Sequence, residues 1–154
     1  MSNPTLSKRQ ALILLATPFA FVFAPSSAQA GLPSVIAYRD PGCGCCEKWG
    51  EVMKQAGFAL TMEDDPNLAD RKTSLGVPAA LAGCHTAIIG QYVIEGHVPP
   101  ADVIKFLNEK PDALGLAVSG MPAESPGMEM GGVADKYDVL VFTKDGTSTI
   151  YAKH

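Results

Sequence analysis

Basic charge is scarce in this sequence of 154 residues. Lys and Arg number 12 against 16 Asp and Glu, which gives a formal net charge of −4. There is no block of basic residues and no stripe that interleaves basic with aromatic residues. Proteins that bind nucleic acid usually carry such a patch, so we expect no nucleic-acid partner. The mild acidity mainly favours solubility.

The sequence also lacks an apolar run long enough to cross a bilayer, which takes about 20 residues in a helix. The longest candidate, Ala11–Ala24, follows Lys8 and Arg9 and precedes the small-residue pattern Ala28–Ala30. These features predict a secretory signal peptide that is cleaved before Gly31, and an uncleaved membrane anchor is the alternative. Cleavage leaves 124 residues with a formal charge of −6, and this length is enough for one domain. After cleavage we expect no stable insertion into the membrane.

Cysteine is infrequent but strongly clustered. Three of the four cysteines, Cys43, Cys45 and Cys46, lie within the stretch DPGCGCCEKWG, and the fourth is Cys84. Proteins of an oxidising compartment usually pair their cysteines as structural disulfides. Adjacent cysteines such as Cys45 and Cys46 bridge each other only with severe strain, whereas Cys43 and Cys46 have C-x-x-C spacing. At least one of the clustered cysteines should therefore do something other than form a local disulfide.

The periodicity of apolar residues predicts an α/β chain with the order β-α-β-α-β-β-α. Strands are predicted over 34–38 and 58–64, and over the two halves of 84–97, a hairpin around Gly90 and Gln91. Helices are predicted from about residue 45 to Gly57, between residues 65 and 76, and from Pro99 to Lys110. This order predicts a thioredoxin-like fold, with the cysteine cluster between the first strand and the first helix, where thioredoxins carry theirs.

The character of the sequence changes after Pro111. Residues 115–135 are rich in Gly, Pro and Met, and we expect little regular structure there. Residues 137–153 alternate apolar and polar side chains around Asp145 and Gly146, which predicts a β-hairpin with a two-residue turn. We predict three parts: the signal peptide over 1–30, a thioredoxin-like metal-binding domain over 31–113, and over 114–154 a C-terminal extension packed on that domain.

The clustered cysteines lie just before and within the first turn of the predicted first helix. Backbone N–H groups and the helix dipole lower the pKa of cysteines at such a position and favour thiolate. Thiolate is both a nucleophile and a ligand for soft metals, whereas buried structural thiols are the alternative interpretation. The site of chemistry is therefore predicted at this end of the sheet.

The predicted topology brings further donors to the same end. The third strand should run antiparallel to the first, so Cys84 at its start faces the cluster and completes a four-sulfur site. Thioredoxins place a cis-proline at this position. The fourth strand returns His97 to this end, and His85 neighbours Cys84, although strand alternation points it away. A hydrogen-bonded structural histidine is the alternative for both.

Methionines favour copper as the metal. Met121, Met128 and Met130 lie in the Gly- and Pro-rich segment and could fold over the cysteine end as a lid, or simply cover an apolar patch. Thioether and thiolate together select Cu(I) over harder ions. Zinc is the competing metal, but C-x-C-C is unlike the usual pairs of zinc ligands, and zinc gains nothing from methionine.

Four separated motifs resemble those of the CopG-type periplasmic copper-resistance proteins: YRDPGCGCCEKW, CHTA, YVIEGHVP and GMPAESPGMEM. The resemblance covers about residues 35–151. It implies a thioredoxin-like fold whose C-terminal extension contributes to copper binding. It also implies a cysteine-bridged copper centre and a redox role in which the protein interconverts Cu(I) and Cu(II). The residues that match the family's motifs are Cys43, Cys45, Cys46, Cys84, His85, His97 and the methionine segment 121–130.

Three hypotheses follow for the function. The first is a periplasmic copper-binding protein that acts in copper resistance, either with or without copper oxidoreductase activity. The second is a thiol–disulfide oxidoreductase, which relies on the predicted fold and an activated cysteine. The third is a non-enzymatic carrier that hands copper to an exporter. We expect a monomer whose partners are copper ions and a periplasmic copper efflux or oxidase component.

Overall fold

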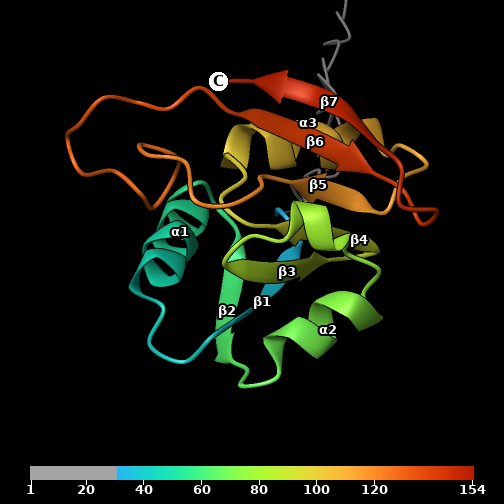
Figure 1. Cartoon of the computed structure of the whole chain (residues 1–154), viewed down its shortest axis with the longest axis horizontal. Coiled ribbons are helices and arrows are strands. Elements are labelled where there is room, and N and C mark those ends of the chain that lie inside the picture. Colours follow the sequence, from blue (N-terminus) through green and yellow to red (C-terminus); the bar gives the residue numbers. More distant parts are fainter. Residues whose placement is uncertain (1–30) are drawn as a thin grey trace, which may run out of the picture.

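A computed structural model describes residues 31–154, so the predicted signal peptide over 1–30 lies outside the described residues. The described chain forms one mixed sheet of seven strands in the order β2-β1-β3-β4-β5-β6-β7. Figure 1 shows this sheet with β2 and β1 toward the bottom and β6 and β7 at the top. The strands are β1 (Ser34–Arg39), β2 (Ala59–Asp64), β3 (His85–Ile89), β4 (Tyr92–Glu95), β5 (Gly115–Ala117), β6 (Asp138–Phe142) and β7 (Ser148–Lys153).

Three α-helices and one short 3₁₀ helix accompany the strands. They are α1 (Gly44–Gln55), α2 (Leu68–Ser74), η1 (Ala79–Leu81) and α3 (Pro100–Glu109). Strands β1 and β2 are parallel, whereas β3 is antiparallel to both β1 and β4. The protein is thus α/β, and the predicted order β-α-β-α-β-β-α is observed as far as α3. Among residues 31–154, no helix combines the length and the apolar character that a membrane crossing requires.

The sheet is covered on both faces. Helices α1 and α3 contribute Trp49, Met53 and Phe106 to the main core cluster, where they pack on side chains of the central strands. A second cluster forms around Val77 and Leu81, near η1. The indole N–H of Trp49 donates to the carbonyl oxygen of Val98 at 3.0 Å, so its burial leaves no polar atom unsatisfied. Each such large apolar side chain contributes about 1.5–3 kcal/mol by leaving water.

Two expectations for the C-terminal region were wrong in part. The Gly- and Pro-rich segment begins with strand β5, which pairs in parallel with β4 and antiparallel with β6. Three residues are too few to show a period, which is why the sequence did not reveal this strand. The final hairpin is present, but its loop spans 143–147 rather than two residues, because Asp145 accepts hydrogen bonds from the side chain of Thr143 and the backbone N–H of Thr147.

Candidate metal centre

The start of α1 presents the three clustered cysteines. Cys43 precedes the first helical residue, with φ −68° and ψ 95°, and its carbonyl accepts the backbone N–H of Glu47 at 3.4 Å. Cys45 and Cys46 lie in the first turn, and Cys46 is fully buried. The first backbone N–H groups of a helix have no partner within it, so this turn favours negative charge. The predicted position of the cluster is confirmed.

Arg39, at the end of β1, holds this loop against the sheet. One guanidinium nitrogen donates to the carbonyl oxygen of Cys43 at 3.0 Å. The others pair with Glu47 in α1 and with Asp64 at the end of β2, each at 2.8 Å. A single planar side chain therefore ties the cysteine loop to the first turn of the helix and to the edge strand.

Strands β3 and β4 bring Cys84 and His97 to the same end of the sheet, as the topology predicted. Cys84 directly precedes β3, and His97 follows β4 by two residues. The two segments are in backbone contact, because a Cβ added to Gly83 would lie 2.7 Å from the Cα of Gly96. Gly96 also has a φ of 68°, which glycine adopts without strain. Only glycine fits at either position.

The donor atoms converge closely. Cys45 Sγ lies 3.5 Å from both Cys43 Sγ and Cys84 Sγ, and Cys46 Sγ lies 3.6 Å from Cys84 Sγ. All four sulfurs lie within 4.8 Å of one another. His97 Nε2 is 2.9 Å from Cys84 Sγ. The structure thus brings the four cysteine sulfurs and the neighbouring imidazole together, as the predicted topology requires.

The sulfurs are not all in the same state. Cys43 and Cys46 form a disulfide, whereas Cys45 and Cys84 are free thiols. This is the pairing with C-x-x-C spacing, and it leaves Cys45 beside the bridge. The expectation that at least one clustered cysteine would have another role agrees with the free thiol of Cys45.

The imidazole of His97 is oriented as in many metal sites. Its Nδ1 lies 2.8 Å from the carbonyl oxygen of Pro126, which can only accept, so Nδ1 carries the proton. Nε2 therefore directs its lone pair at the thiol of Cys84. Burial lowers the pKa of His97, which keeps this ring neutral. A ligand histidine typically has this arrangement, with its second nitrogen bonded to a carbonyl group.

The thiol of Cys84 fits a soft cation. Burial raises its pKa to about 12, and the neighbouring Cys45 adds to the shift. Without a cation the thiol thus keeps its proton, which a metal ion would replace between Cys84 and His97. Two thiols and a neutral imidazole form a donor set suited to copper, zinc or another thiophilic metal.

His85 lies beside the cluster rather than away from it. Its ring is fully buried and packs on Trp49, with 4.2 Å between ring centroids. Nδ1 is 3.8 Å from Cys84 Sγ, and Nε2 has no hydrogen-bond partner within residues 31–154. Burial, with the nearby His97 and Lys72, lowers its pKa well below the usual value. A central strand is buried on both faces, which is why alternation misjudged this residue.

Two solved structures resemble the chain over most of its length. Both are called copper resistance protein CopG, forms 1 and 2, and they are 40% and 39% identical to it. Each has a TM-score of 0.76 and covers 80% of this chain and 98% of the solved chain. The chain belongs to the CopG family. Residues 81–128 also match a family described as a protein of unknown function, DUF411, and no curated protein matches the chain.

This CopG-family chain contains a buried polar network that its sequence did not reveal. Glu95, fully buried in β4, accepts hydrogen bonds from Lys72 Nζ at 2.5 Å, from the backbone N–H of Gly83 at 2.7 Å and from the hydroxyl of Thr86. Lys72 also donates to Thr86 at 2.8 Å. The carboxylate thereby fixes the residue before Cys84, and the ammonium group opposes the rise in the Cys84 pKa.

The methionine segment of the CopG-family chain passes close to the cluster. A Cβ on Gly127 would lie 2.6 Å from the backbone nitrogen of Trp49, and Pro126 accepts from His97, so 126–127 lies directly on α1. In Figure 1 the long loop between β5 and β6 runs on the same side as α1. Met121 is 56% exposed and Met130 88% exposed, while Met128 is half-buried. Their roles as ligands remain predictions.

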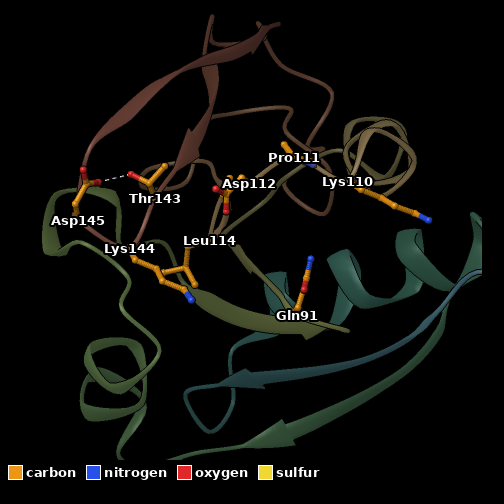
Figure 2. A pocket seen from close by; sticks show the side chains of 9 residues that line it. Gln91, Lys110, Pro111, Asp112, Leu114, Thr143, Lys144 and Asp145 are labelled. Atoms are coloured by element: carbon orange, nitrogen blue, oxygen red, sulfur yellow. Dashed lines mark hydrogen bonds between the residues drawn. The ribbon is translucent and has the colours of Figure 1, made fainter.

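The described region has one hollow beside the cysteine cluster and another far from it. A small one of about 240 Å³ opens beside Cys84 and is lined by Gly83, Gly120 and Met121 among others. Another, of about 620 Å³, lies at the opposite end of the sheet, around Gln91 and the loop of the final hairpin (Figure 2). The charged side chains that line it in this CopG-family chain, Lys110, Asp112, Lys144 and Asp145, are exposed.

Proposed function

We propose that this protein is a copper-binding protein of copper resistance, and that Cys45, Cys84 and His97 are the core of its copper site. The observation that carries this proposal is the convergence of two free thiols and one oriented imidazole, with 3.5 Å and 2.9 Å between neighbouring donors. The solved relatives are named as copper resistance proteins, which supports copper as the cargo.

The donor set favours Cu(I) over zinc. A closed structural zinc site needs four ligands, and a four-sulfur site would require the thiolates of both Cys43 and Cys46. Those two sulfurs form a disulfide here, yet the set of Cys45, Cys84 and His97 remains intact. Two thiolates and an imidazole suit Cu(I), and the half-buried and exposed methionines nearby add soft donors along the route to the site.

The cellular setting forms part of the proposal. A signal peptide over 1–30 would export the chain to the periplasm. There the protein would act as a monomer, interconvert Cu(I) and Cu(II), and exchange copper with an efflux or oxidase component. The hollow beside Cys84 offers a route for that exchange.

The test is anaerobic loading of the metal-free protein with Cu(I), followed by desalting and metal analysis. The wild type should retain copper, and Cys45→Ser should lose most of it. Met53→Leu is the matched control, because it alters a soft side chain that is buried in the core. Full copper retention by Cys45→Ser would show that the thiols are not the site.

A second function is favoured by one specific observation. The disulfide between Cys43 and Cys46 has C-x-x-C spacing and lies at the start of the helix that follows β1, as in thiol–disulfide oxidoreductases. Reduction of insulin by the metal-free protein and dithiothreitol distinguishes the two functions. A rate like that of thioredoxin would favour the oxidoreductase, and a rate no higher than that of dithiothreitol alone would favour copper binding.

A further inference from the structure

Two chemically different sulfur pairs share one small space. Cys43 and Cys46 are joined, whereas Cys45 and Cys84 are free, although all four sulfurs lie within 4.8 Å. Cys45 Sγ is equally distant from Cys43 Sγ and Cys84 Sγ, at 3.5 Å. An ion held by Cys45 and Cys84 would therefore contact or nearly contact the sulfurs of the other pair.

The disulfide between Cys43 and Cys46 contributes little to the stability of the fold. It closes a loop of only four residues, and a short loop restricts the unfolded chain least. The position of this loop is already fixed by Arg39, which binds the carbonyl of Cys43 and pairs with Glu47 and Asp64. A purely structural disulfide would duplicate these contacts, so the pair calls for a chemical explanation.

We propose that Cys43 and Cys46 are an electron store that reduces Cu(II) to Cu(I), and that Cys45, Cys84 and His97 retain the Cu(I) produced. This inference rests on the proposed copper-binding function. Each of the two thiols gives up one proton and one electron, a sulfur–sulfur bond forms, and two Cu(II) ions become two Cu(I) ions. The described disulfide is then the oxidised state of the store.

The geometry supports this division of roles. Cys46 Sγ is 3.6 Å from Cys84 Sγ, and Cys43 Sγ is 3.5 Å from Cys45 Sγ, so each sulfur of the store adjoins one ligand of the site. Electrons need cross no intervening side chain. Because the two thiols of the store are already close together, they form their bond far faster than thiols on separate molecules.

Regeneration requires two electrons from an exported protein with a dithiol. Its thiolate would attack Cys43 Sγ, because Cys43 is half-buried whereas Cys46 is fully buried. Cys46 would leave as a thiolate in the first turn of α1, where the helix terminus stabilises negative charge. The second thiol of the donor then resolves the mixed disulfide, which restores the dithiol and leaves the donor oxidised.

The experiment starts from fully reduced, metal-free protein under anaerobic conditions. Two equivalents of a Cu(II) salt are added, Cu(I) is measured with a chromophoric Cu(I) chelator, and remaining thiols are alkylated and located by peptide mass spectrometry. The wild type should form two Cu(I) per chain and lose the thiols of Cys43 and Cys46, while those of Cys45 and Cys84 stay free.

Two serine variants with equal numbers of cysteines serve as matched partners. Cys43→Ser should reduce Cu(II) at least about tenfold more slowly, because the thiol of Cys46 has lost its C-x-x-C partner and the nearest remaining thiol, that of Cys84 at 3.6 Å, holds the copper. It should still retain Cu(I) that is added directly. Cys45→Ser should still oxidise the pair Cys43 and Cys46 but should lose copper on desalting.

The outcomes separate this inference from the proposed function. If the wild type fails to retain directly added Cu(I), the copper-binding function itself is wrong. If it retains Cu(I) but Cu(II) leaves all four thiols free, or oxidises Cys45 with Cys84, the electron store is overturned alone. Equal reduction rates for Cys43→Ser and the wild type would also overturn it.

Discussion

The buried ion pair of Lys72 and Glu95 permits a quantitative test of how the site is supported. Lys72→Met keeps the aliphatic chain and removes the ammonium group. Glu95 is fully buried and the side chain of Lys72 is 11% exposed, so little solvent replaces the lost partner. The carboxylate keeps its hydrogen bonds from Thr86 and from the backbone of Gly83.

The expected loss follows from these contacts. Removing one partner of a buried ion pair typically costs about 3–5 kcal/mol, because the other charge remains buried. The two remaining donors to Glu95 offset part of this, so we expect a loss of about 3 kcal/mol. For a domain of this size that corresponds to a decrease in Tm of roughly 10 °C. Adding Glu95→Gln to Lys72→Met should recover part of the loss, since no unpaired charge remains.

Urea and thermal unfolding of the metal-free protein measure these differences. Lys105→Met is the matched control, because Lys105 is 59% exposed and pairs with Glu109 at 3.8 Å on the surface of α3. It should change the free energy of unfolding by no more than about 0.5 kcal/mol. If Lys72→Met is no more destabilising than Lys105→Met, the network does not carry the electrostatic role assigned to it.

Two further predictions concern the loop and the buried imidazole. Arg39→Gln removes the guanidinium group that donates to the carbonyl oxygen of Cys43, so the affinity of the protein for Cu(I), measured by competition with a chelator, should fall several-fold. Lys48→Gln, at an exposed position of α1, should leave this affinity unchanged. Equal affinities of the two variants would contradict the role of Arg39. His85 is buried with a pKa well below its usual value of about 6.5, so below that pH the unfolded metal-free chain binds a proton that the folded chain does not. The free energy of unfolding of the wild type should therefore decrease as the pH is lowered from 7 to 5, and it should decrease less in His85→Phe. If the urea midpoints of both proteins decrease equally, the low pKa of His85 is not the cause.

Sequence patterns predicted the order of the first seven elements and the meeting of Cys84 with the cluster, because both follow from strand direction. The return of the fourth strand to the same end of the sheet was sufficient to place His97. The family resemblance inferred from the motifs is confirmed by the solved relatives. The thioredoxin-like description and the individual methionine ligands stay predictions.

The partnership of Lys72 and Glu95 could not be predicted in the same way. Lysine is normally exposed, and Lys72 lies in a short, mostly polar helix. The available signal was Glu95 itself, a carboxylate in the otherwise apolar strand YVIE. The state of Cys43 and Cys46 was likewise undetermined, because spacing permits both a disulfide and two thiolate ligands.

The backbone contact between Gly83 and Gly96 has a thermodynamic consequence. Since no side chain separates the two segments, Cys84 and His97 reach their mutual distance of 2.9 Å when the sheet forms, without any ion. The conformational entropy of bringing these donors together is thus lost during folding and not during binding. Such a preorganised site takes up its cargo with little rearrangement. A substitution that separates these segments should therefore weaken affinity even where the fold tolerates it.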